Sequence, residues 1–103
     1  ESEGQQDAVA VIEAAAAARR PEHEAVAESA LRETLRRAGQ ADGDARAVVT
    51  RTRDGLDVSL LVAPETPQGA RARAAVRVVG ALRDFDADAP QINLSVGVVD
   101  HAG

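Results

Sequence analysis

The sequence predicts an α+β fold of the split βαβ type, in the order (β)αββαβ, with two main helices packed on one face of a sheet. Three features predict this class: a hairpin signal at Asp54-Gly55, a helical stretch on each side of the hairpin, and an alternating strand near the end. The length of 103 residues suits one domain with a modest core.

The first main helix is predicted to begin at Pro21 and to end before Gly39. Proline is tolerated in a first helical turn, and the acids that follow it suit the positive end of the helix dipole. Glycine is a common residue just after a helix. The buried face is predicted from the 3.6-residue spacing of Val26, Ala30, Leu31 and Leu35.

A β-hairpin is predicted next. The segment 45–53 is rich in β-branched residues, Asp54-Gly55 is a tight-turn dipeptide, and the segment 56–62 alternates before becoming fully apolar. An apolar run of this kind indicates a strand buried on both sides, so the second arm is expected to be central in the sheet. Pro64 and Pro67 end it.

The second main helix is predicted over residues 70–82, and an acidic connection over 84–90 leads to the last strand. Its expected buried stripe consists of Ala75, Val76, Val79 and Leu82. In the last strand, apolar residues that are expected to face the core alternate with Asn93, Ser95 and Gly97. The apolar set is Ile92, Leu94, Val96 and Val98.

The first part of the chain allows two readings. Residues 1–6 are polar and are expected to form a disordered leader, and residues 7–103 are expected to form the domain. Residues 8–13 fit a short buried strand, but Asp7 could equally cap a helix that runs through the alanines. The start lacks a methionine and is not a signal peptide, which is consistent with a fragment preceded by a membrane segment or sensor domain.

Composition argues against several classes of function. The net charge of −5 disfavours binding of nucleic acid, which requires neutralisation of phosphates by basic side chains. The chain has no cysteine, so disulfides and thiolate chemistry are excluded. The two histidines, His23 and His101, lack metal-ligand spacing and are expected to be exposed bystanders. We therefore expect no catalytic residues, no metal and no cofactor.

Two segments resemble a known family. The stretch Asn93-Leu94-Ser95-Val96-Gly97-Val98 and the hairpin Gly55-Leu56-Asp57-Val58-Ser59 together resemble the C-terminal half of a GGDEF (diguanylate cyclase) domain over residues 45–100. The resemblance implies a ferredoxin-like or nucleotide-cyclase-like sheet. Gly55 and Asp57 match the signature, whereas Leu56, Val58 and Ser59 replace its second glycine, its glutamate and its phenylalanine.

These departures imply a domain without the chemistry of the family. Such a cyclase holds divalent cations with carboxylates at two places. Here Asp57 is the one acid left in the turn, and Glu13 would have to replace the first-strand aspartate. The resemblance therefore implies a non-catalytic signalling, dimerisation or protein-interaction module, with a protein partner or a second copy as its ligand.

Two further functions remain open. The segment Arg51-Thr52-Arg53-Asp54 has the internal spacing of an RxxD product site in this family, but it abuts the turn, and a charged hairpin end with Asp54 serving the turn is the favoured interpretation. In a regulatory domain binding a nucleotide or another small ligand, the binding residues would be Arg51, Arg53, Asp54 and Asp57. Alternatively, the order helix, hairpin, helix, strand resembles that of alkaline-shock envelope domains, which implies a small α/β accessory domain of a membrane-anchored or envelope stress protein. The expected location is cytoplasmic, including as part of a membrane-anchored protein.

Overall fold

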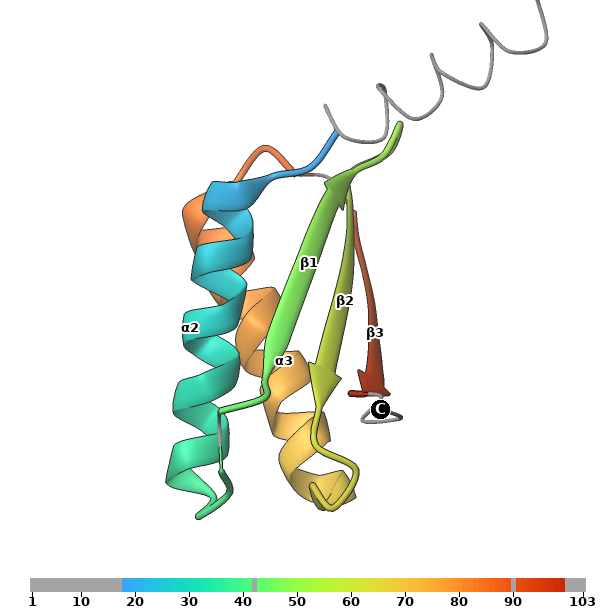
Figure 1. Cartoon of the computed structure of the whole chain (residues 1–103). Helices are drawn as coiled ribbons and strands as arrows, with labels where there is room; N and C mark the ends of the chain where they lie inside the picture. Colours follow the sequence, from blue (N-terminus) through green and yellow to red (C-terminus); the bar gives the residue numbers. More distant parts are fainter. Residues whose placement is uncertain (1–17, 42, 90, 100–103) are drawn as a thin grey trace, which may run out of the picture.

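The computed structural model describes residues 18–41, 43–89 and 91–99, and all structural statements below concern these residues. In chain order the elements are helix α2 (Pro21–Arg37), strands β1 (Arg46–Arg51) and β2 (Leu56–Val62), helix α3 (Gln68–Phe85) and strand β3 (Ile92–Val98) (Figure 1). The α+β class and the order αββαβ are confirmed. The strand or helix expected at 8–13 and the histidine His101 lie outside the described residues.

The sheet has the strand order β1-β2-β3. β1 and β2 pair antiparallel, with Val49 opposite Val58, and β2 and β3 pair parallel, with Val58 opposite Leu94. β2 is therefore the central strand, as its apolar run predicts. Helix α3 forms the crossover between β2 and β3, which are direct neighbours in the described part of the sheet.

The hairpin turn is closed by two local hydrogen bonds, and a third, long-range bond ties it to the start of β3. The N–H of Thr52 donates to the carbonyl of Gly55 at 2.8 Å, and the N–H of Gly55 donates to the hydroxyl of Thr52 at 3.0 Å. The N–H of Leu56 donates to the carbonyl of Gln91 at 2.8 Å. A Cβ atom on Gly55 would overlap that Gln91 carbonyl, so the close approach of the two backbones requires a glycine here.

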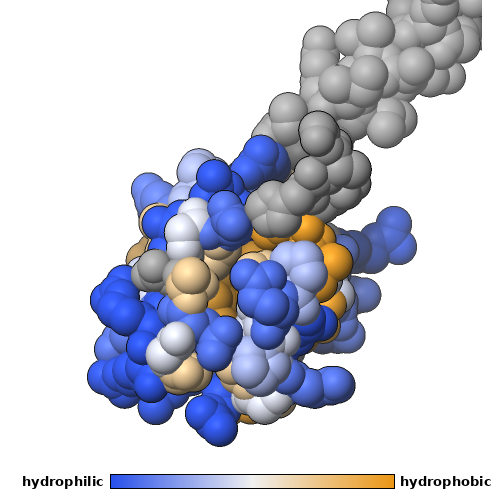
Figure 2. All heavy atoms as spheres, turned by 60° about the horizontal axis from the view of Figure 1, so that its bottom comes forward, coloured by the Kyte–Doolittle hydropathy of each residue, from blue (hydrophilic) through white to orange (hydrophobic). Residues whose placement is uncertain are grey.

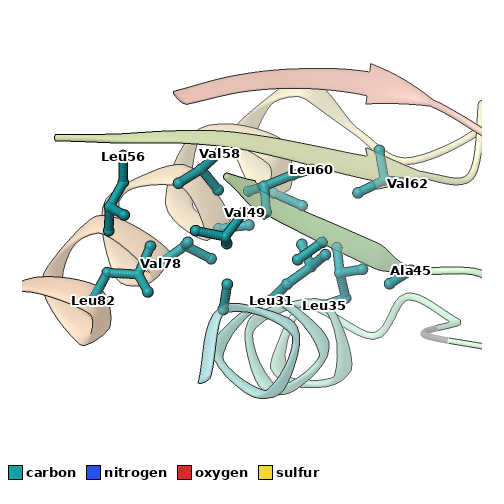
Figure 3. Packing of buried hydrophobic residues seen from close by; sticks show 14 residues of the cluster. Leu31, Leu35, Ala45, Val49, Leu56, Val58, Leu60, Val62, Val78 and Leu82 are labelled. Atoms are coloured by element: carbon teal, nitrogen blue, oxygen red, sulfur yellow. The ribbon is translucent and has the colours of Figure 1, made fainter. Parts of the chain in front are cut away.

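Both helices pack on the same face of the sheet, and the core lies between the two layers (Figure 3). The sheet contributes mainly the alternate residues of β2, and α2 contributes Leu31 and Leu35. Thr34 is also buried, and its hydroxyl is satisfied because it donates to the carbonyl of Ala30 at 2.8 Å. The most deeply buried large side chains are Leu31, Leu35, Val49, Val58, Leu60, Val62, Val78 and Leu82.

The stripe predicted for the second helix was largely wrong. The buried residues of α3 are Ala70, Ala74, Val78 and Leu82, whereas Val76 is 73% exposed. Small apolar residues occupy almost the whole circumference of this helix, so periodicity does not identify one face. The helix is also longer than the predicted 70–82, and Arg71 anchors its start by donating to the carbonyls of Pro64 and Thr66, both at 3.0 Å.

Two glycine-to-alanine substitutions are expected to have opposite effects. Gly55→Ala should lower the free energy of unfolding by about 1–3 kcal/mol, because the new methyl group forces the hairpin away from Gln91. Gly80→Ala should raise it by about 0.5–1 kcal/mol, because Gly80 is a solvent-exposed helical residue and an added methyl group would meet no other atom. Urea unfolding followed by circular dichroism measures both, and equal stability of Gly55→Ala and the wild type would contradict the proposed contact.

Candidate functional site

A depression of about 420 Å³ lies at the hairpin end of the sheet. Residues from the start of α2, from the hairpin turn and from the loop after α3 line it. The structure brings three of the predicted ligand-binding residues, Arg51, Arg53 and Asp54, to this hairpin-end depression. The fourth, Asp57, lies on the sheet face opposite the helices, where its carboxylate accepts a hydrogen bond from the Asn93 amide at 3.2 Å.

The hairpin-end depression carries charges of both signs. Arg20 joins the two predicted arginines, and Asp86 and Asp88 join Asp54. Carboxylates beside the arginines repel a phosphate, so this lining is less favourable to an anion than the arginines alone would be. Within residues 18–41, 43–89 and 91–99, no group of three potential metal ligands comes together. The depression could hold a small polar molecule.

His23 is a structural residue of this region, and the expectation that it is an exposed bystander was wrong. Its side chain is only 14% exposed, and its Nε2 lies 3.0 Å from Oδ2 of Asp86. Its ring also packs edge-on against Phe85, with the ring centroids 4.9 Å apart. The sequence could not indicate this contact, because the start of α2 and the end of α3 are joined only by tertiary packing.

The His23 hydrogen bond is the main cause that lowers the pKa of Asp86 below its ordinary value, and partial burial opposes it. The N–H of Asp88, which donates to Oδ1 of Asp86 at 3.2 Å, and the charges of His23 and Arg20 also favour the ionised form. The Asp86 carboxylate therefore ties α2 to the end of α3. This contact fixes the start of α2 and the end of α3, which form two sides of the hairpin-end depression.

The edge of the sheet formed by β1 is closed. The N–H groups of Ala47 and Val49 point away from β2 and donate to the carboxylates of Glu28 and Glu24 of α2, at 3.2 and 3.1 Å. The segment before α2 completes the cover, because Arg51 N–H donates to the carbonyl of Ala18 at 2.8 Å. An incoming strand would find these donors occupied.

Glu24 holds its position at this edge as a charged group. Burial opposes its ionisation, but hydrogen bonds from Arg19 and from the N–H of Val49, together with the Arg19 charge, keep the pKa of Glu24 below its ordinary value. The Arg19 guanidinium lies 2.6 Å from the carboxylate. A charged acceptor of this kind makes a stronger hydrogen bond to the strand than a neutral one would.

The edge formed by β3 is open in the described part of the chain, where the sheet ends at this strand. The carbonyl of Gln91 and the N–H of Val99 both bond to β2. Because backbone direction alternates along a strand, the odd-numbered residues between them also face β2. The N–H and C=O groups of the even-numbered residues therefore point outward, and these residues are Ile92, Leu94, Val96 and Val98.

The side chains of these even-numbered residues face the helical layer but are incompletely covered. Ile92, Leu94 and Val96 are half-buried and Val98 is 46% exposed, and none of the fourteen described residues of the buried core belongs to β3. The strand also contains no charged residue. Figure 2 shows apolar residues gathered on one side of an otherwise largely hydrophilic surface.

We call this surface the β3 edge: the outward backbone groups of Ile92–Val98, their half-buried side chains and the adjoining flank of α3. Sheet edges in soluble proteins are commonly protected by charges, proline or a covering element. Among the described residues, the β1 edge has such protection and the β3 edge does not. The alternation of apolar and polar residues predicts this strand but not its position at the rim, which only the pairing of the strands reveals.

Comparison of the chain with models of known protein families, with curated proteins and with solved structures finds no match. The resemblance to GGDEF domains therefore remains an expectation from the residues themselves. In the described part of the chain, neither helix is both long and apolar enough to span a lipid bilayer.

The pairing of Asp86 with His23 predicts a pH-dependent contribution to stability. Because the pKa of Asp86 is lower in the folded than in the unfolded chain, its contribution is present above its ordinary value of 3.8 and is lost as the pH falls through the lowered pKa. Asp86→Asn should therefore be less stable than the wild type at pH 7, and the difference should shrink below that ordinary value.

Urea unfolding at several pH values measures this difference. Glu65→Gln, which removes an exposed carboxylate in the turn before α3, is the matched control and should show no comparable loss at pH 7. A constant gap between Asp86→Asn and the wild type down to pH 2.5 would mean that the carboxylate charge is not what stabilises the contact.

Proposed function

We propose that this chain is a non-catalytic interaction module, resembling a GGDEF domain without its chemistry, that binds a protein partner by adding a strand to the β3 edge. The observation that carries the proposal is the contrast between the two sheet edges. The donors of β1 are bound by α2, whereas β3 offers outward backbone groups beside incompletely covered apolar side chains. Strand addition uses these two features, backbone hydrogen bonds for affinity and side-chain contacts for specificity.

The hairpin supports the non-catalytic part of the proposal. Leu56, which stands where the family has its second glycine, is 3% exposed and belongs to the core. Val58, which replaces the glutamate, is buried as well. Asp57 lies on the other face, bonded to Asn93. The stretch 55–59, where the signature of the family would stand, therefore supplies one carboxylate, which supports a domain without the two-cation chemistry of the family.

A second candidate function is binding of a phosphate-bearing small ligand at the hairpin-end depression. It is supported by the convergence of Arg51, Arg53 and Asp54 on that depression. Titration calorimetry with GTP and with cyclic diguanylate, each with Mg²⁺, separates the two candidates. If the chain is an interaction module alone, neither nucleotide should give a saturable binding heat. Saturable binding that is lost in Arg51→Ala but kept in Arg73→Ala, an exposed arginine of α3, would favour the second candidate.

Proline substitutions in β3 test strand addition. In Val96→Pro the missing N–H is one that points outward, so the β2–β3 ladder keeps its bonds and the domain should still unfold cooperatively. Ser95→Pro removes an N–H that faces β2 and should destabilise the fold, by about 1–3 kcal/mol for the unpaired carbonyl alone. The two substitutions are neighbours, so they separate the edge from the ladder.

The binding probe is a fluorescein-labelled peptide of residues 91–99 with two added lysines for solubility, followed by fluorescence anisotropy. Dilute wild-type protein should bind it saturably, and Val96→Pro should bind it roughly tenfold more weakly or worse, which corresponds to about 1.4 kcal/mol. A peptide of the same composition in scrambled order is the control. No binding of the ordered peptide, or equal binding by Val96→Pro, would refute strand addition at the β3 edge.

A further inference from the structure

We infer that the strand that completes the β3 edge is β3 of a second copy of this chain, running antiparallel about a two-fold axis at Ser95. The inference rests on the proposed function and names its partner. A two-fold axis at this point joins two three-stranded sheets into one, with all four helices on the same face. The same surface then serves both copies, as closed dimeric symmetry requires.

The outward backbone groups fix the register. In an antiparallel pair, residues that exchange both hydrogen bonds must each point toward the partner strand. With Ser95 on the axis, Ile92 lies opposite Val98 of the second copy, and Leu94 lies opposite Val96. All of these residues point outward, so each outward N–H meets an outward carbonyl.

The side chains agree with this register on both faces of the sheet. On the helical face, the opposed residues are the incompletely covered apolar ones, and pairing extends the core across the axis. On the other face, Asn93 lies opposite Gly97, which leaves room for the amide, and Ser95 lies opposite Ser95. The strand carries no charge, so two identical copies bring no like charges together at the axis.

The flank of α3 beside β3 is suited to a second helix. One side of α3 faces α2 of the same chain. The residues of α3 that line the hollow between the two helices are Arg77, Gly80, Ala81 and Asp84. Helical spacing places the half-buried Ala75 and Val79 on the other side, toward the β3 edge, whereas the exposed Ala72 and Val76 lie farther from the core, toward solvent. The small Ala75 and the β-branched Val79 allow close approach at this flank.

The size of this surface is sufficient for a reversible dimer. The seven residues of β3 span about 23 Å, and the sheet and helix layers together are about 20 Å deep. The buried surface is then on the order of 500 Å² per copy and about 1,000 Å² in total, which is the lower limit for a specific interface. We therefore expect a dimer that dissociates on dilution.

Single-cysteine variants test the register directly, because the chain has no cysteine of its own. In Ser95→Cys the two sulfur-bearing residues face each other in a non-hydrogen-bonded pair, with Cα atoms about 4.5 Å apart, within reach of a disulfide. In Asn93→Cys the two cysteines are four residues apart along the paired strands, which is about 14 Å. In Ser59→Cys they are separated by three strand spacings, also about 14 Å.

All three positions are exposed on the same sheet face, so the variants differ in geometry rather than in accessibility. Under mild oxidation with copper phenanthroline, Ser95→Cys should form a disulfide dimer at least tenfold faster than either control. Adding Val96→Pro to Ser95→Cys should remove this advantage. Light scattering of the wild type should show a mass that rises from one chain toward two with concentration.

The remaining outcomes overturn the inference without deciding the proposed function, which the peptide experiment tests separately. Equal rates for the three variants would indicate random collision. A wild-type dimer without preferential cross-linking at Ser95→Cys would indicate another register or surface. A monomer that still binds the peptide would mean that the strand comes from a different protein or from another segment of this chain.

Discussion

The fold depends on the double pairing of β2. This strand forms the antiparallel ladder with β1 on one side and the parallel ladder with β3 on the other, and its inner face supplies Leu56, Val58, Leu60 and Val62 to the core. Everything else is arranged around it: α2 packs beside β1, and α3 carries the chain back to β3. Burial of one large aliphatic side chain contributes about 1.5–3 kcal/mol, so these four positions hold a large share of the stability of so small a domain.

The two helices cover the two edges of the sheet to different extents, and the less covered edge is the candidate site, the β3 edge. α2 reaches over β1 with Glu24 and Glu28, whose carboxylates take the place of a neighbouring strand. α3 lies against α2 on one side, and no described residue covers its other flank, next to β3, in a comparable way. Since both helices share one core, a shift of α3 toward β3 would uncover Val78 and Leu82. The open edge is therefore a consequence of how the core is filled.

Local sequence signals predicted most elements correctly. Pro21, Asp54-Gly55 and the alternation of β3 each act over a few residues, and the corresponding helix, turn and strand are present. The errors concern interactions between distant segments. Val76 was placed in the core because valines lie on several sides of α3, and His23 was placed in solvent because its partner Asp86 is 63 residues away. The sequence predicted three residues of the hairpin-end depression, but it did not show that Asp57 lies elsewhere, on the opposite face of the sheet. It also did not show which edge of the sheet is open and which is closed.

The net charge of the chain affects how strongly copies associate through the open β3 edge, and this effect depends on salt. A net charge of −5 opposes indiscriminate association of copies, yet none of that charge lies on β3 itself. Long-range repulsion is screened within about 8–10 Å at physiological salt, whereas backbone hydrogen bonds and apolar contact act at the edge. Association through β3 should therefore strengthen as salt rises. An interface made by charge pairs would weaken, so the sign of the salt dependence distinguishes strand pairing from electrostatic docking.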